Sequence, residues 1–182
     1  MGGRDKAQLP LNGRPMIEWV IDRFRHQVSK LILNTNSDDR ALAALGYPII
    51  VDAIAGYPGP LAGLHAGMMA CSTQTPLLAC VPCDAPLLPS DLVLRLHQDL
   101  TAAKADIAVV RTSNGLQPTF LLCRCMLGPS IENFLAEGGR AFHHWLARQH
   151  CIEVFFPDEA AFSNVNTPQD MERIGSILGK QA

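Results

Sequence analysis

Short apolar runs alternate with amphipathic segments along this chain, and that alternation is the feature that most limits its possible folds. Such runs are typical of strands buried on both faces, and the segments between them carry apolar residues at helical spacing. Strands that alternate with helices are joined by right-handed crossovers, so we expect a three-layer α/β fold with a mainly parallel sheet. The predicted strands are residues 31–33, 48–51, 77–81, 107–110, 119–122 and 152–156, and the predicted helices are residues 15–24, 39–45, 61–70, 90–100, 131–136 and 141–149, with a last helix after Thr167.

Two local signals refine this prediction. A turn around Asn114-Gly115 separates the strands at residues 107–110 and 119–122, so these two strands can form a hairpin. Thr167, Pro168 and Asp170 have the spacing of an N-cap, a first helical residue and a capping-box partner. The last helix is therefore expected to begin there.

Composition favours one globular domain over residues 1–182, because 48% of the 182 residues are apolar and 18% are charged. The net charge of −2 provides no basic field, so we expect neither a nucleic-acid nor a membrane partner. No apolar stretch reaches the roughly 20 residues that cross a bilayer, and residues 1–10 are polar. We expect a cytoplasmic protein whose six cysteines are reduced and form no disulfide bonds.

The carboxyl ends of three predicted strands lead to the loops that contain Asn34, Asp52 and Asp84. Ligands of open α/β sheets bind at this edge, where several loops converge. Asp84 lies in a loop bounded by Pro82 and Pro86, where its carboxylate can hold a cation such as Mg²⁺ or simply cap the next turn. From the residues alone, both interpretations stay open.

The amino-terminal segment combines glycines with positive charge. Gly2 and Gly3 permit a close backbone approach, and Arg4 and Lys6 can attract a polyphosphate. The alternative is a solvated chain end without a ligand. A Walker A motif and a complete G-x-G-x-x-G fingerprint are both absent from the sequence, which argues against a P-loop NTPase and an ordinary dinucleotide-binding enzyme.

Other polar residues give weaker indications. Cys80 and Cys83 have C-x-x-C spacing, but no second pair completes a zinc site and no helix opens at the motif, so we interpret them as ordinary thiols. Asn164 and Asn166 precede the last helix, whose amino terminus favours an anion. These asparagines can bind a ligand or only shape the turn.

Five segments taken together, in order along nearly the whole chain, are similar to the molybdenum cofactor guanylyltransferase family. The loop at residues 57–63 combined with residues 164–168 is more specific than any single segment. Related cytidylyl and sugar-nucleotide transferases generally lack that combination. The segments are Met1-Gly2-Gly3-Arg4-Asp5-Lys6, Tyr57-Pro58-Gly59-Pro60-Leu61-Ala62-Gly63, Cys83-Asp84-Ala85-Pro86, Gln117-Pro118-Thr119 and Asn164-Val165-Asn166-Thr167-Pro168.

This resemblance implies a Rossmann-like nucleotidyltransferase domain that transfers GMP from GTP to molybdopterin carrying molybdenum, with Mg²⁺ and release of pyrophosphate. It also implies contact with other proteins of molybdenum cofactor biosynthesis. The implied catalytic residues are Lys6 and Asp84, with Asp84 holding the metal. The implied nucleotide-binding residues are Gly2, Gly3, Lys6, Asn34, Asp52 and Asp84, and the implied pterin-side residues are Asn164, Asn166 and Arg140.

The sequence departs from the family pattern at two places. Family members have a buried strand and a Leu-Ala-Gly-Gly loop at their amino-terminal end, and the match here starts at Met1, inside that motif. Arg140 is followed by Ala141, where many relatives have two arginines. One alternative, with the same chemistry, is a cytidylyl- or sugar-nucleotide transferase of the same fold. The missing phosphate loop motivates a second alternative, a non-catalytic nucleotide or pterin carrier.

Overall fold

The structure is a computed structural model of the chain, and it describes residues 8–37, 40–54, 56, 59–72 and 74–180. The predicted phosphate-binding residues Gly2, Gly3 and Lys6 lie outside the described residues. Every predicted strand and helix has a counterpart in the structure, with boundaries shifted by a few residues at some ends.

The strands form a four-stranded sheet and two smaller pairs. The four-stranded sheet has the order β5-β7-β6-β8, and the short strands β3 and β4 pair in parallel. β7 is antiparallel to β5 and β6, whereas β8 is parallel to β6. The hairpin prediction is thus confirmed, and the sheet is more mixed than the helix–strand alternation indicated. The bounds are β1 Pro10–Leu11, β2 Arg14–Pro15, β3 Leu33–Asn34, β4 Ile49–Ile50, β5 Leu77–Cys80, β6 Ile107–Thr112, β7 Gly115–Arg124 and β8 Cys151–Phe155.

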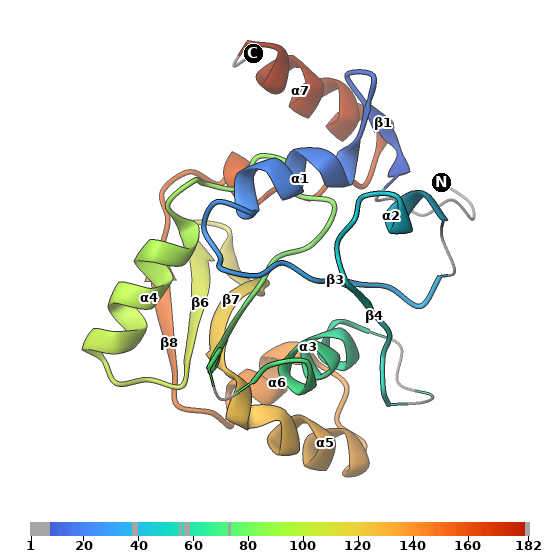
Figure 1. Cartoon of the computed structure of the whole chain (residues 1–182). Coiled ribbons are helices and arrows are strands. Elements are labelled where there is room, and N and C mark those ends of the chain that lie inside the picture. Colours follow the sequence, from blue (N-terminus) through green and yellow to red (C-terminus); the bar gives the residue numbers. More distant parts are fainter. Residues whose placement is uncertain (1–7, 38–39, 55, 57–58, 73, 181–182) are drawn as a thin grey trace.

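Helices cover both faces of the four-stranded sheet, as Figure 1 shows. Along β6, Ala108 and Val110 pack with α1 and α4, while Ile107 and Val109 pack with α3, α5 and α6. This alternation follows from the two-residue period of a strand. The predicted three-layer α/β architecture is confirmed. The helices are α1 Met16–Phe24, α2 Arg40–Ala43, α3 Pro60–Met69, α4 Leu92–Ala102, α5 Gly128–Ala136, α6 Phe142–Leu146 and α7 Pro168–Gly179, with short 3₁₀ turns at Cys125–Leu127 and Ala160–Phe162.

The last helix, α7, begins at the predicted capping box. Thr167 Oγ1 accepts a hydrogen bond from the Asp170 N–H at 3.1 Å, and the Asp170 carboxylate accepts one from the Thr167 N–H at 2.9 Å. The apolar face of α7 packs against Leu11 and Met16 in a separate cluster. Among the described residues, no helix has the length and hydropathy needed to cross a bilayer.

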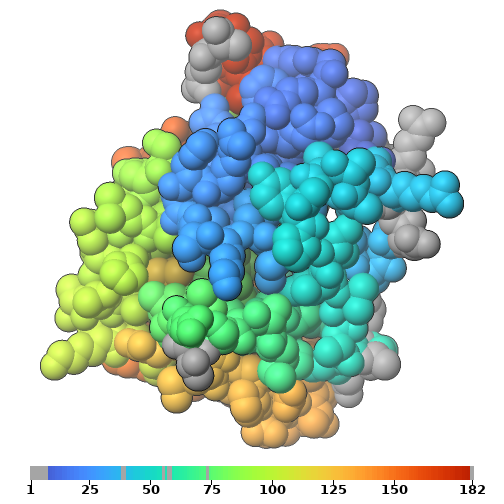
Figure 2. Space-filling model, in the orientation of Figure 1, coloured from blue at the N-terminus to red at the C-terminus, as the bar shows by residue number. Residues whose placement is uncertain are grey.

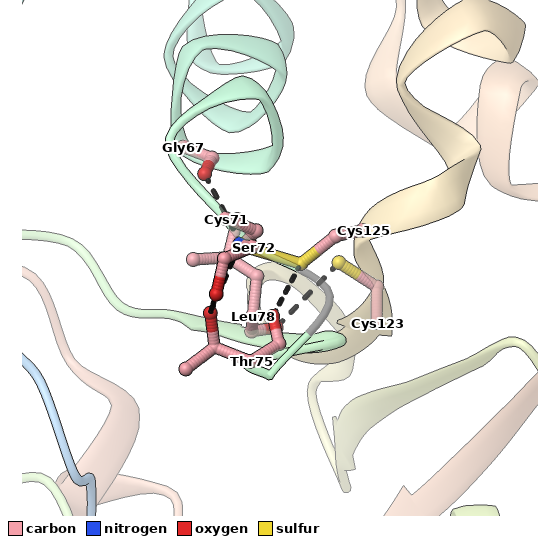
Figure 3. The surroundings of a disulfide bond; sticks show 7 residues. All are labelled: Gly67, Cys71, Ser72, Thr75, Leu78, Cys123 and Cys125. Carbon is pink, nitrogen blue, oxygen red and sulfur yellow. Dashed lines mark hydrogen bonds between the residues drawn. A yellow bond between two sulfur atoms is a disulfide. The ribbon is translucent and has the colours of Figure 1, made fainter.

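A disulfide bond joins Cys71 and Cys125, so the prediction that all cysteines are reduced is wrong (Figure 3). Cys71 follows the end of α3 and Cys125 follows the end of β7, and the fold brings their Cα atoms to 6.3 Å. The Cys125 N–H also donates to the carbonyl of Pro76 at 2.8 Å. The prediction was based on the expected cytoplasmic location, in which cysteine thiols usually stay reduced. The pairing instead depends on two distant chain segments that lie close together in the fold.

Candidate active site

A cavity of about 580 Å³ lies between β3 and β5 and opens at the carboxyl ends of these strands. Asn34, at the end of β3, and Asp84, in the loop after β5, both line it. Residues on α1 and α3 complete its walls. The structure therefore brings together two side chains that are 50 positions apart, as the sheet-edge argument predicted.

Asp52 is held by the side chains of Asn34 and Asn36. The Asn34 amide donates to Asp52 Oδ1 at 3.1 Å, and the Asn36 amide donates to Oδ2 at 2.8 Å. In return, the Asp52 N–H donates to the Asn36 side-chain oxygen at 2.9 Å. Because both carboxylate oxygens are engaged, Asp52 has a fixed orientation with lone pairs left to accept from a ligand. Asn36 was missed as a site residue, although its position two residues after Asn34 was a signal for the same edge.

Gly63, in the first turns of α3, lies directly against the Asn34 side chain. A Cβ atom at this position would collide with Asn34 Oδ1 and would stand 3.8 Å from Asp52 Oδ1. A helix interior normally disfavours glycine, so the close approach gives a physical reason for glycine here. The resemblance included Gly63 as part of a loop motif, but its contact with Asn34 is visible only in three dimensions.

The loop that contains Asp84 is joined to the segment before α7. The Val165 N–H donates to the Asp84 carbonyl at 2.8 Å, which places Asn164 next to the Asp84 turn. Asn164 Oδ1 is buried, and no described group donates a hydrogen bond to it. A buried amide oxygen without a donor is costly, which makes Asn164 suited to a ligand.

Asn166 lies two residues after Asn164, just before the N-cap residue of α7. Its N–H donates to Asp170 Oδ2 at 3.1 Å, and its side chain is exposed. Hydrogen bonds from the Thr167 hydroxyl and from the N–H groups of Asn166 and Thr167 lower the pKa of the Asp170 carboxyl below its usual value. Asp170 thus occupies the positive end of the helix that an anionic ligand would otherwise use.

Arg140 lies in a different part of the molecule from Asn164 and Asn166. It is in the turn between α5 and α6, and Figure 1 shows this turn at the opposite end of the molecule from α7. Its guanidinium donates to the carbonyls of Leu135 and Gly139, at 3.1 and 2.6 Å. The structure therefore does not bring Arg140 next to Asn164 and Asn166.

The C-x-x-C pair near Asp84 is not a bonded pair. No disulfide bond includes Cys80 or Cys83, Cys83 is exposed, and burial raises the pKa of Cys80 to about 11. Within the described ranges, no group of three or more His, Cys, Asp or Glu side chains is arranged around a common metal position. A metal at this site would have to take other ligands from a substrate or from water.

Polar groups at the carboxyl edge of a three-layer α/β sheet, beside a cavity of nucleotide size, define a class of enzyme: the nucleotidyltransferases. The chain belongs to the family of MobA-like NTP transferase domains, whose family model matches residues 1–152.

Relatives with assigned names agree with this family. The chain is 41% identical over 179 residues to the molybdenum cofactor guanylyltransferase of Shewanella loihica, covering 98% of this chain and 90% of that protein. It is 42% identical over 173 residues to the enzyme of the same name from Yersinia pestis, covering 94% and 87%.

Solved structures show the same fold. Molybdopterin-guanine dinucleotide biosynthesis protein A from Archaeoglobus fulgidus matches with a TM-score of 0.78 at 20% identity, over 98% of this chain and 92% of that one. Rv0371c from Mycobacterium tuberculosis, in complex with manganese, matches with a TM-score of 0.69 at 17% identity, over 96% and 93%.

Proposed function

We propose that this enzyme transfers GMP from GTP to molybdopterin that carries molybdenum, forming the guanine dinucleotide of the cofactor and pyrophosphate. Relatives about 40% identical over nearly their whole length are named for this activity. The observation that supports it within the chain is the shared cavity of Asn34 and Asp84, bonded through the Asp84 carbonyl to the segment of Asn164. Donor and acceptor sides of a transfer reaction would thus meet at Asp84.

We assign the nucleotide to the side formed by β3 and β4. Asn34 and Asp52 offer an oriented amide and an oriented carboxylate, which suit the polar edges of a base or a ribose. Gly2, Gly3 and Lys6 are proposed for the phosphates, since the lysine charge would offset the charge that develops on leaving pyrophosphate.

We propose one divalent cation, Mg²⁺, on Asp84. The donor set fits such an ion, because Mg²⁺ in phosphoryl-transfer sites uses one or two carboxylates and takes its remaining ligands from phosphates and water. An ion there would supply charge neutralisation at the transferred phosphate. Asp84 would orient it at the cavity wall, and the bond from the Val165 N–H would hold the loop backbone in place.

The acceptor is assigned to Asn164 and Asn166. The unsatisfied Asn164 oxygen would accept from an N–H of the pterin, and Asn166 would contact the same ligand at the exposed end of the segment. A pterin contact for Arg140 stays a prediction, as do the cytoplasmic location and partner proteins of the cofactor pathway.

The test is pyrophosphate release from GTP in the presence of molybdenum-loaded molybdopterin. Asp84→Ala is expected to lower turnover by about a hundredfold or more, because it removes the ligand that orients the metal and the phosphates. Asp99→Ala is the matched control: Asp99 is an exposed carboxylate on α4, outside the cavity, and its loss should leave turnover unchanged. Circular dichroism and unfolding curves should be alike for both variants.

Undiminished turnover in Asp84→Ala would refute the assignment. The same assay with CTP, and with sugar phosphates as acceptors, separates this proposal from the cytidylyl- and sugar-nucleotide alternatives. GTP binding without turnover in any combination would instead favour the carrier.

A further inference from the structure

The disulfide bond between Cys71 and Cys125 is accessible from solvent. Both cysteines are partly exposed, whereas Cys123, two residues before Cys125, is fully buried. Figure 2 shows that the green segment at the end of α3 reaches the surface and borders the orange segment of α5. A thiolate in solution can therefore reach this bond, which is a requirement for thiol–disulfide exchange.

The segments on either side of the bond are uncharged. Residues 69–76 and 125–131 include no Asp, Glu, Lys or Arg. Met69 on one segment and Met126 on the other are 62% and 77% exposed. An approaching thiolate thus meets apolar side chains in these segments, and no carboxylate within them repels its negative charge.

Each sulfur of the bond lies close to a backbone carbonyl, as Figure 3 shows. Cys71 Sγ is 3.4 Å from the Gly67 oxygen, one turn earlier in α3, and Cys125 Sγ is 3.6 Å from the Thr75 oxygen. Sulfurs in a disulfide carry no hydrogen, so these contacts become S–H···O hydrogen bonds only when the bond is reduced. The structure therefore offers each cysteine a separate acceptor in the reduced state.

The disulfide ties the carboxyl end of α3 to the four-stranded sheet. The N–H groups of Ala70 and Cys71 donate to the carbonyls of Ala66 and Met68, at 3.1 Å in both cases. These hydrogen bonds are internal to the helix segment, whereas the disulfide continues from Cys71 to the end of β7. Reduction would thus leave the turn at the helix end intact and release it from the sheet.

The other end of α3 contacts the nucleotide side of the candidate site. Gly63 lies against the Asn34 side chain, and the Asn34 amide donates to Asp52 Oδ1 at 3.1 Å. Gly63 and Cys71 are eight residues apart, on the same helix and on the residue pair that follows its end. Because a short helix shifts as a unit, release of its carboxyl end alters the contact between Gly63 and Asn34.

From these observations we propose that Cys71 and Cys125 form a reversible exchange site for dithiol reductants, and that its redox state controls how firmly α3 holds Asn34 against Asp52. The effect on GTP affinity rests on the function proposed above.

The exchange proceeds in two steps. One thiolate of the dithiol attacks a sulfur of the bond, which forms a mixed disulfide and releases the other cysteine as a thiolate that takes up a proton. The second thiolate of the reductant then displaces the remaining cysteine, which is protonated in turn. The dithiol leaves as a disulfide, and two electrons and two protons have passed to Cys71 and Cys125.

The experiment compares the whole chain oxidised in air with the same chain equilibrated with dithiothreitol, a small dithiol. The number of thiols titrated after denaturation should rise from four to six. In the native reduced chain the amides of Ala70 and Cys71 should exchange at least about tenfold faster, while the amide of Leu121 within β7 should be unchanged. The side-chain amide resonances of Asn34 should shift, and GTP affinity, measured by calorimetry, should fall at least about fivefold.

The double variant Cys71→Ser, Cys125→Ser is the control, because it lacks the bond in every condition. It should match the reduced parent chain in amide exchange and in GTP affinity, with and without dithiothreitol. A response of this variant to dithiothreitol would assign the effect to other cysteines and would overturn the proposal.

Three results with the parent chain would also overturn it: no gain of thiols in excess dithiothreitol, unchanged exchange at Ala70 and Cys71 after reduction, or unchanged Asn34 resonances and GTP affinity after reduction. Failure of GTP to bind to either form would contradict the proposed function instead. The thiol count, the amide exchange and the Asn34 resonances would then still decide the exchange site, because none of them requires a nucleotide.

Discussion

The four-stranded sheet with its helices, here called the four-stranded half, and the β3-β4 pair with its loops, here called the polar half, differ in structure and in the side chains that they present. The four-stranded sheet has strands of four to ten residues, and its central strands β6 and β7 are packed by helices on both sides. The β3-β4 pair has two residues in each strand, and polar side chains form the network around Asp52. We infer that the four-stranded half supplies most of the stability of the fold. The polar half contributes less to stability, so its side chains can be selected for contact with a ligand.

The largest expected effect is in the four-stranded half. Phe120 on β7 is 1% exposed and packs edge-to-face on Phe162 with ring centroids 5.0 Å apart. Phe120→Ala should lower the free energy of unfolding by about 3–5 kcal/mol through lost burial and a cavity. The matched change Val51→Ala, next to β4 at 62% exposure, should stay within about 0.5 kcal/mol. Urea unfolding of both variants measures this difference in the free energy of unfolding. Similar decreases in the two variants would refute the inference that the four-stranded half supplies most of the stability.

A smaller effect concerns the pH dependence of the four-stranded half. Burial raises the pKa of Cys80 on β5 to about 11 from an ordinary 9.0. Above pH 9 the unfolded chain loses this proton first and so binds fewer protons, which means that stability falls as the pH rises toward 11. A two-unit shift corresponds to about 3 kcal/mol once both states are ionised.

Cys80→Ala should therefore flatten the decline of the unfolding free energy between pH 9 and pH 11. Burial raises the pKa of Cys123 and Cys151 as well, so part of the decline would remain. Leu94→Ala is the control, because this exposed side chain carries no ionisable group and its removal should leave the slope unchanged. A Cys80→Ala slope equal to that of the parent chain would contradict the explanation.

The layered fold could be predicted well from the sequence, because the evidence for each strand and helix comes from residues that are close together in the chain. Strand and helix periods, the capping box at Thr167 and the hairpin through Asn114 all depend on residues close together in the chain. The shared edge of Asn34 and Asp84 was also predictable, since parallel strands deliver their carboxyl ends to one side.

The rest depends on contacts between distant segments. The Cys71–Cys125 bond joins residues 54 positions apart, and nothing in their spacing identifies them as partners among six cysteines. The close approach of Gly63 to Asn34 required knowing how α3 lies on β3. Arg140 was grouped with Asn164 by resemblance, and the chain places their segments at different ends of the molecule.

The smallest effect tests the polar half directly. Gly63→Ala would ordinarily stabilise a helix by about 0.5–1 kcal/mol, but here the new methyl group displaces the Asn34 oxygen. The gain should therefore be cancelled in the parent chain and recovered in an Asn34→Ala background. A double-mutant cycle by urea unfolding is expected to give a coupling of about 1 kcal/mol. GTP affinity, measured by calorimetry, should fall about tenfold in Gly63→Ala alone, because a weakened Asn34–Asp52 contact costs about 1.4 kcal/mol.

Gly67→Ala is the matched control for this cycle, because it lies one helical turn further along α3 and its Cβ would meet the flexible end of Leu78. It should show no coupling to Asn34→Ala in urea unfolding. Equal coupling at both glycines would mean that α3 responds as a rigid body to any added methyl group. In that case the effect of Gly63→Ala would come from the packing of α3 as a whole and not from its contact with Asn34. The polar half could then not be changed without also changing the four-stranded half.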